Sequence, residues 1–349
     1  MFEYTVLPIS KKKKETVENE IKINSSPLSQ LQPIRTSKQR MQDARNQPPI
    51  KQLCSMIWQT NELHLLFADT GIGKSILAVA LSDALSKGKR LMLLENENEP
   101  LKVLYYDFEL SDRQFRKRYS NEVGHEYSFS DNFFIDSIDF VALTNINLQA
   151  RINELLFQKI IFDIEQTRAQ VLVIDNLTFL NTQSTQDTQI ALEVMRKLNE
   201  LKKDYNLSIL VLAHTPKRDL SSPLTINHLA GSKHLSNFAD SISAIGKSIQ
   251  GTNIRYWKQI KPSRSGEMLY DTHNVINCEI VKTNELLTFD FISYSPESDH
   301  LREDRENQTN ERKGIARQLS AQGKSLREIA QEMGIGKSTI QRWINEKPL

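Results

Sequence analysis

One stretch of the sequence decides the fold: Glu62-Leu63-His64-Leu65-Leu66-Phe67, an apolar run of strand length, leads into Ala68-Asp69-Thr70-Gly71-Ile72-Gly73-Lys74-Ser75 and then into an apolar helical pattern. A strand, a glycine loop and a helix in this order form a phosphate-binding loop (P-loop), because backbone N–H groups and the helix N-terminus converge on the anion. In such a loop, Lys74 reaches the β- and γ-phosphates and Ser75 offers its hydroxyl to Mg²⁺. The sequence therefore predicts a nucleotide site in which residues 68–75 are all binding candidates.

Ala68 stands at the first position of this loop, where the strict pattern has Gly, and the departure is expected to cost some backbone freedom. Gly71 and Gly73 remain where the loop is tightest. Two further Gly-Lys-Ser triplets occur at residues 246–248 and 336–338, and both lack the strand-to-helix setting. A chance triplet is the alternative interpretation of the motif, and the flanking pattern argues against it at residues 73–75.

The composition favours a protein with a substantial core. Its 349 residues suggest two domains, and 39% of them are hydrophobic and 25% charged. No run approaches the roughly 18 apolar residues of a membrane span, and no apolar segment follows the N-terminal lysines, so we expect a cytoplasmic protein without a membrane partner. Cys54 and Cys278 lack the spacing of a metal site or a disulfide framework and are interpreted as reduced thiols.

The net charge of +2 is unevenly distributed along the chain. Residues 1–50 carry nine Lys or Arg against five acidic residues, and residues 311–349 carry eight against four. Basic ends on an acidic body favour contact with nucleic acid at the ends. At the N-terminal end, a solvated tail explains the same charges equally well.

Changes of composition divide the chain into four parts. Residues 1–48 are polar and are predicted to be a basic, mostly disordered arm. Residues 49–294 carry the strand and helix patterns of one ATPase domain, beginning with a short helix between Ile50 and Ile57. Residues 295–310 are charged and are interpreted as a linker, and residues 311–349 are predicted to form a small helical DNA-binding domain.

Two carboxylates follow predicted strands downstream of the P-loop. Glu109 comes after the strand at residues 102–108 and is a candidate general base, with Asp107 as the next candidate, because ligands bind at the carboxyl ends of strands in open α/β sheets. The run Val171-Leu172-Val173-Ile174-Asp175 is a buried-strand pattern whose terminal carboxylate can join Ser75 in the Mg²⁺ shell. This pattern alone is weak evidence, and it gains weight from the P-loop before it.

His214 ends another predicted strand, where a polar residue can hydrogen-bond the γ-phosphate or the attacking water. A histidine that simply caps the strand is the alternative. Residues 215–235 then form a long polar loop on the nucleotide side of the sheet, and we interpret it as a candidate site for single-stranded DNA. Residues 241–246 and 253–259 are two further strand-like runs. Alternation of apolar and polar residues over 279–293 predicts antiparallel edge strands that finish the sheet.

The C-terminal part predicts three helices, at residues 313–322, 325–333 and 337–345. Ile329, Ile340 and Trp343 would form a small core around a turn at Gly334, which is the pattern of a helix-turn-helix. A helical hairpin without a DNA-binding role is the alternative. The exposed face of the last helix would offer side chains that can meet phosphates or base edges of duplex DNA, namely Lys337, Ser338, Gln341, Arg342 and Asn345.

Taken together, residues 50–292 resemble the RecA-like hexameric ATPases, and among them the plasmid RepA replicative helicase group. The resemblance rests on residues 68–75, on Tyr106-Asp107-Phe108-Glu109-Leu110-Ser111, on Val173-Ile174-Asp175-Asn176, on Leu212-Ala213-His214, and on Gly231-Ser232-Lys233 with Lys261 and Arg264. Residues 311–349 resemble the small recombinase-type DNA-binding domains, which those helicases do not generally carry. The expected fold is α/β, a RecA-like P-loop NTPase core with a mostly parallel sheet, plus a small all-α C-terminal helix-turn-helix domain.

The resemblance also implies roles for individual residues. In this family the glutamate after the second strand activates water, which corresponds to Glu109, and the strand-end histidine is a sensor, which corresponds to His214. Basic residues near the end of the domain reach into the neighbouring subunit's site, a role that fits Arg264 with Lys261, and Arg255 is the next candidate. The family further implies ATP and Mg²⁺ as cofactors and a homo-oligomer, a hexamer.

The sequence thus predicts an ATP-hydrolysing, DNA-binding protein, a RepA-like helicase or translocase that acts in replication or mobilisation of a plasmid or integrated mobile element. The alternative is an ATP-dependent regulatory switch that sits on DNA in transcription, transposition or defence, without motor activity. Stimulation of hydrolysis by single-stranded DNA would separate the two. A binding protein with an inactive nucleotide site is disfavoured because Lys74, Glu109 and Asp175 are all present.

Overall fold

The computed structural model describes residues 34–137, 152–176, 188–215, 220–229, 232–302 and 305–345. The chain divides into two compact units, Met1–Pro49 and Ile50–Leu349. In the described part of the first unit, α2 (Ser37–Arg45) begins after Thr36, whose hydroxyl accepts a hydrogen bond from the Gln39 amide at 3.1 Å. None of its residues is buried. The predicted arm therefore contains a helix without an apolar face, which explains why hydrophobic periodicity did not reveal it.

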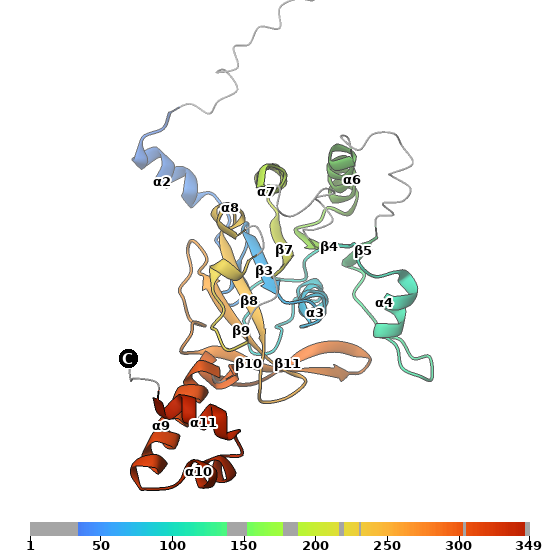
Figure 1. The fold of residues 1–349 in the computed structure, drawn as a ribbon. Helices are drawn as coiled ribbons and strands as arrows, with labels where there is room; N and C mark the ends of the chain where they lie inside the picture. The colour runs from blue at the N-terminus through green and yellow to red at the C-terminus, as the bar shows by residue number, and fades with distance from the viewer. Residues whose placement is uncertain are drawn as a thin grey trace, which may run out of the picture. The chain divides into compact units, whose positions relative to one another are not determined.

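A nine-stranded sheet, built from described residues, forms the centre of the second unit (Figure 1). Its order is β11 (Leu286–Ser295), β10 (Val275–Thr283), β9 (Ile254–Lys261), β8 (Ser241–Lys247), β3 (Leu63–Ala68), β7 (Ser208–His214), β6 (Val171–Asp175), β4 (Val103–Asp107) and β5 (Phe133–Asp136). The strands from β8 to β5 are parallel, and β9, β10 and β11 extend the sheet in antiparallel pairs. The predicted α/β class with a mostly parallel sheet is confirmed.

Both faces of β3 are buried, which is why its sequence is a continuous apolar run. On one face, Leu65 and Phe67 pack in a cluster with α6 (Ile152–Thr167) and α7 (Thr188–Asp204). On the other face, Leu66 packs in a second cluster with α3 (Lys74–Ser86). The P-loop strand is thus the central layer of a three-layer α/β/α arrangement.

His64 on β3 joins this strand to β8, its parallel neighbour. The two imidazole nitrogens lie 2.8 Å from Ser241 Oγ and 2.7 Å from Ser243 Oγ, and the histidine is only 2% exposed. Both serines belong to β8, and Ser241 is the residue paired with His64. A polar side chain inside the apolar strand is therefore fully hydrogen-bonded.

The predicted short helix before the P-loop strand is absent. Residues of that region form β1 (Gln52–Cys54) and β2 (Trp58–Gln59), joined by a turn with Ser55 at a positive φ of 47°. Leu53, Ile57 and Trp58 are all buried, each 1% exposed. Ile50, the first residue of the predicted helix, is 60% exposed, so the apolar residues match a helical spacing without forming the buried face of a helix.

The predicted linker at residues 295–310 also differs from the structure. Its first half contains η6 (Glu297–His300), in which Glu297 is buried and accepts hydrogen bonds from the Leu224 amide at 2.6 Å and from Lys258 Nζ at 2.5 Å. Its second half includes the start of α9 (Arg305–Ala321). Charged residues are usually exposed, but here the buried Lys258 compensates the charge of the buried Glu297. Composition alone therefore could not predict that this segment is part of the core.

The remaining described elements are short or lie in the C-terminal part. They are α4 (Asp112–Arg118), η5 (Ile226–His228), α8 (Ser232–Phe238), α10 (Leu326–Met333) and α11 (Lys337–Asn345). The last three helices of the chain, α9, α10 and α11, enclose a core of Ala316, Ile329, Ile340 and Trp343, and so the predicted all-α C-terminal domain is confirmed. None of the helices described is long and apolar enough to cross a membrane.

Candidate functional site

The P-loop connects β3 to α3 and has the backbone conformation that its glycines predict. Gly71 and Gly73 have φ values of 75° and 114°, which favour glycine. A Cβ atom on Gly73 would also lie 2.9 Å from Ile280 Cδ1 and 3.1 Å from Phe289 Cζ, side chains of β10 and β11. Ala68 ends β3 as a buried strand residue without a positive φ, so the expected cost of lacking glycine there does not arise.

Strand register aligns the predicted polar residues along the carboxyl edge of the parallel sheet. Ala68 pairs with His214 across β3 and β7, and Asp107 pairs with Asp175 across β4 and β6. Since β6 and β7 are themselves neighbours, these residues lie side by side at the edge where the P-loop begins. The register therefore brings together residues that lie on different strands and are distant in the sequence.

Lys74 and Glu109 are connected through His214. Lys74 Nζ donates to the Ala68 carbonyl at 2.9 Å and lies 3.1 Å from His214 Nδ1. An ammonium group can only donate, so Nδ1 is the acceptor in this contact. Nε2 lies 3.5 Å from Glu109 Oε1. The contact with His214 is the main reason that the pKa of Glu109 is held below its ordinary value, and Lys74 also lowers it.

Asn176, which follows Asp175, also contacts Glu109 and His214. Its amide donates to Glu109 Oε1 and lies 2.9 Å from His214 Nε2. We did not predict a role for Asn176 from the sequence, although its position directly after a strand-end carboxylate is a signal that could have indicated one. It therefore joins the set of residues that fix the orientation of Glu109.

Asp107 shapes the turn that carries Glu109. Its Oδ1 atom accepts hydrogen bonds from the backbone amides of Glu109 and Leu110, both at 2.9 Å. Asp107 is 4% exposed, whereas the side chain of Glu109 is 40% exposed. Of the two carboxylates considered as general bases, Glu109 is the one open to a water molecule.

Asp175 has the properties of a metal-ligating carboxylate. Tyr105 donates its hydroxyl to Oδ2 at 2.7 Å, while Oδ1 is buried without a hydrogen-bond partner in the described part of the chain. Burial raises the pKa of Asp175 to about 6, although hydrogen bonds from Tyr105 and Ser75 lower it. A buried carboxylate beside the Ser75 hydroxyl, with one oxygen unsatisfied, fits a hard cation such as Mg²⁺. The described residues hold no group of three or more His, Cys, Asp or Glu side chains arranged for a metal.

The three basic candidates near the end of the domain lie in different places. Arg255 is 7% exposed, and its Nε donates to the Ile72 carbonyl of its own P-loop at 2.7 Å. Lys261 Nζ donates to the carbonyls of Ser236 at 3.0 Å and Ala239 at 2.6 Å. Only Arg264 is well exposed, with 68% of its side chain accessible. Arg255 therefore supports the P-loop of its own chain and is not placed to enter a neighbour's site.

Arg264 lies at the opposite edge of the sheet from the P-loop of its own chain. It follows β9 and contacts Asp240, the residue before the first residue of β8, whereas the P-loop follows the last residue of β3. Along a parallel strand of six residues, the two edges are roughly 17 Å apart. Arg264 is therefore not brought together with Lys74, Glu109 and His214 of the same chain.

The candidate single-strand-binding loop is described only in part. Thr215 donates its hydroxyl to Asp69 Oδ1 in the P-loop, so the loop starts beside the nucleotide site. The Leu224 amide is bound by Glu297. Residues 216–219 and 230–231 of the predicted loop lie outside the described residues.

The helix-turn-helix is formed by α10 and α11. Ser325 caps α10, and Glu328 accepts a hydrogen bond from the Ser325 amide at 2.7 Å. Gly334 closes α10, and Ile340 and Trp343 of α11 face the small core. The five residues predicted to contact DNA are all exposed on α11, namely Lys337, Ser338, Gln341, Arg342 and Asn345.

Two parts of the chain match known protein families. Residues 27–219, more than half of the chain, match the model of the AAA domain family, and residues 309–346 match the homeodomain-like domain. No curated protein matches the sequence. Among solved structures, the chain is similar to the KaiC-like protein PH0186 from the hyperthermophilic archaea Pyrococcus horikoshii OT3, with 13% identity and a TM-score of 0.47, covering 70% of this chain and 100% of that chain.

The fold and the site define a P-loop protein with a RecA-like α/β core and a C-terminal helix-turn-helix. The chain belongs to the AAA domain family.

Proposed function

We propose that this protein hydrolyses MgATP and uses the reaction to move on DNA, as a RepA-like helicase or translocase in replication or mobilisation of a plasmid or integrated mobile element. The proposal rests on the contact from Lys74 through His214 to Glu109. A phosphate bound by Lys74 would be sensed by His214, which in turn contacts the candidate base. Such an arrangement suits an enzyme whose turnover depends on the state of its nucleotide.

Each residue of the site has a role in this proposal. Lys74 and the loop amides stabilise phosphate charge, and Glu109 orients the attacking water and accepts its proton. The lowered pKa of Glu109, caused mainly by His214, keeps the carboxylate ionised, so it can accept a hydrogen bond from the water that it orients. Ser75 and Asp175 would hold Mg²⁺, which neutralises charge on the phosphates.

Arg264 completes the site in a second copy of the chain. Because it lies at the far edge of its own sheet and is exposed, it can approach only a nucleotide that another copy binds. A planar, permanently charged guanidinium is suited to the γ-phosphate in the transition state. We accordingly propose a homo-oligomer, a hexamer by resemblance, in which Arg264 acts in trans and Lys261 supports the turn that carries it.

Two parts of the chain would contact DNA. The exposed face of α11 would bind duplex DNA through Lys337, Ser338, Gln341, Arg342 and Asn345. Residues 215–235 begin beside the P-loop at Thr215 and would bind a single strand. The second contact is the one that a motor requires, because it lies next to the nucleotide.

The helix-turn-helix supports a second candidate function, a DNA-bound regulatory switch without motor activity. ATP hydrolysis measured with single-stranded DNA, with duplex DNA and without DNA separates the two. A motor should be accelerated by single strands. Duplex binding together with turnover that single strands leave unchanged would support the switch, and ATP binding without any hydrolysis would contradict both.

A further inference from the structure

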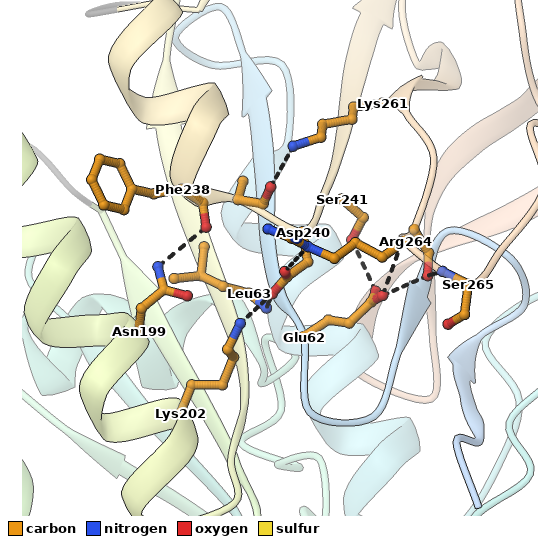
Figure 2. A network of polar contacts seen from close by, with 12 residues as sticks. Glu62, Leu63, Asn199, Lys202, Phe238, Asp240, Ser241, Lys261, Arg264 and Ser265 are labelled. Atoms are coloured by element: carbon orange, nitrogen blue, oxygen red, sulfur yellow. Dashed lines mark hydrogen bonds and ion pairs between the residues drawn. The ribbon is translucent and has the colours of Figure 1, made fainter. Parts of the chain in front are cut away.

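The turn that carries Arg264 is held at several points to the amino edge of the parallel strands (Figure 2). Glu62, directly before β3, accepts hydrogen bonds at Oε1 from Ser263 Oγ at 2.5 Å and from the Arg264 amide at 3.3 Å. Ser265 Oγ donates to Gln59 Oε1 at 2.5 Å. The backbone of Arg264 is therefore fixed relative to the sheet, although its side chain extends into solvent.

The side chain of Arg264 is held by a second carboxylate, that of Asp240. Arg264 Nε lies 2.5 Å from Asp240 Oδ1. The other carboxylate oxygen, Oδ2, accepts the Leu63 amide at 2.9 Å and the Lys202 ammonium. Among the described residues only Nε of the guanidinium is bound, and the two Nη groups have no partner.

Asp240 is suited to hold an arginine that must also bind something else. Burial alone would raise its pKa, but the Leu63 amide, Lys202 and Arg264 together keep its pKa below the ordinary value, so the carboxylate stays ionised. If the Arg264 charge is shared with a second anion, Lys202 and the Leu63 amide still compensate the buried carboxylate. Asp240 can thus serve as a fixed anchor without becoming an unpaired buried charge.

The space beside this anchor carries an excess of positive charge. Asp240 and Arg264 line a cavity of about 550 Å³, and its other charged lining residues are Arg196, Glu200, Lys202 and Lys203. Four of these side chains are cationic and two are acidic. A surplus of cations beside the two Nη groups is complementary to a phosphate group.

We propose that Asp240, supported by Lys202, is a positioning residue that binds Arg264 through Nε and leaves both Nη groups to bind the γ-phosphate of a nucleotide held by a second copy of this chain. The inference rests on the proposed function, in which Arg264 acts in trans. One bond to Nε fixes the plane of the guanidinium, and two Nη groups in a fixed plane can bind two phosphate oxygens at once. Because Asp240 would orient the guanidinium before the nucleotide arrives, the guanidinium would lose less conformational freedom when the transition state forms.

The decisive experiment is a double-substitution cycle on the full chain with Asp240→Asn and Arg264→Ala. Arg264→Ala alone should lower kcat by about 10³- to 10⁵-fold, and Asp240→Asn alone by about 10- to 100-fold, as for partners that orient a functional group. KM for ATP and the oligomeric state should not change. In the Arg264→Ala background, Asp240→Asn should cause no further loss, because its only route to the reaction is through Arg264.

A mixing experiment gives a readout that a purely structural role of Asp240 would not change. Asp240→Asn and Glu109→Gln are each slow alone, but rings containing both should regain activity at interfaces that join an intact Glu109 to an intact Asp240 and Arg264. Glu200→Gln is the matched control, since this exposed acid lines the same cavity and has no contact with Arg264 among the described residues. It should leave kcat within about twofold of the original chain.

Arg264→Lys tests the same idea should Asp240→Asn fail to fold. Lysine keeps the charge but cannot be anchored at Nε while presenting two further nitrogens, so kcat should fall almost as far as in Arg264→Ala. Three results would overturn the positioning role of Asp240 but not the trans-acting role of Arg264. They are normal turnover in Arg264→Lys, increased turnover in Asp240→Asn, and additive losses of turnover in the double-substitution cycle. Full turnover in Arg264→Ala would instead refute the trans-acting arginine of the proposed function.

Discussion

Lys74 and Glu109 stand at the two ends of one chain of polar contacts through His214, so substitutions at each should affect different steps. Lys74→Ala should abolish hydrolysis and weaken ATP binding, because it removes the cation that binds the phosphates. Glu109→Gln should still bind ATP and turn over about 10²- to 10⁴-fold more slowly, since only proton transfer is impaired. Equilibrium binding of a fluorescent ATP analogue and steady-state phosphate release measure the two effects.

Asp107 provides the comparison for this prediction. Its Oδ1 caps the amides of Glu109 and Leu110, so Asp107→Asn should disturb the turn and reduce thermal stability as well as turnover. Near-normal turnover in Glu109→Gln would move the role of general base to Asp107.

The sequence predicted the residues at strand ends better than those inside strands. Asp175 and His214 end recognisable strands and Glu109 follows one, and parallel strands bring their carboxyl ends to one edge. Arg255 lies inside β9, where neither charge nor spacing indicates which carbonyl the guanidinium meets. Asn176 was missed because an amide has no charge that would suggest a catalytic role.

At the scale of elements, the antiparallel extension of the sheet supports the nucleotide loop. Arg255 of β9 binds the Ile72 carbonyl, and Ile280 of β10 and Phe289 of β11 lie against Gly73. Sequence alternation over residues 279–293 predicted edge strands that finish the sheet, and residues 253–259 were predicted as a further strand. Their contact with the P-loop could not be predicted, because it depends on how the sheet twists and on which side chains meet across layers.

Gly73→Ala and Gly71→Ala form a matched pair that tests this contact. Both substitutions place a Cβ at positive φ, which costs about 1 to 2 kcal/mol. Only the Cβ at position 73 would also collide with Ile280 and Phe289, whereas position 71 has no atom within 4 Å. Gly73→Ala should therefore lose ATP binding and more stability than Gly71→Ala in urea unfolding. Equal losses of ATP binding and stability in the two variants would show that β10 and β11 do not restrict the P-loop.

Other elements show why sequence patterns were insufficient. The spacing of apolar residues before β3 matched a helix, but the structure contains two short strands there, and Ile50 is exposed while Leu53 and Ile57 are buried. The charged segment after β11 was interpreted as a linker, but Glu297 is buried against Lys258. In the second case the deciding partner, Lys258, is distant in the sequence.

At the scale of the whole molecule, the start of α9 in the structure gives a better end point for a truncated chain than the composition of the sequence does. Arg302 donates its amide to the Leu220 carbonyl at 3.1 Å, and α9 starts at Arg305. A cut at residue 311 would leave part of α9 attached to the ATPase core. A chain ending at Arg302 should keep its basal ATPase activity and lose duplex DNA binding, as fluorescence anisotropy and phosphate release would show.

Arg342→Ala in the full chain tests whether α11 reads the bases. The substitution should weaken duplex binding by about 1 to 3 kcal/mol if Arg342 contacts a base edge, and less selectively if it contacts only phosphate. Lys203→Ala is a suitable control, because it removes an exposed cation outside the helix-turn-helix. Unchanged duplex affinity in the chain ending at Arg302 would refute the DNA-binding role of this domain.

The bridge from His64 to Ser241 and Ser243 makes the centre of the sheet sensitive to acid. Burial lowers the pKa of His64 to about 3 from 6.5, so the neutral ring stabilises the fold fully above pH 6.5, and this stability is lost as the pH falls toward 3. By pH 5 the loss is about 2 kcal/mol. His64→Gln keeps a hydrogen-bonding side chain that does not titrate, and its urea midpoint should change less between pH 7.5 and pH 5 than that of the original chain. A mildly acidic medium would therefore weaken the molecule at its centre, on the strand that leads to the nucleotide.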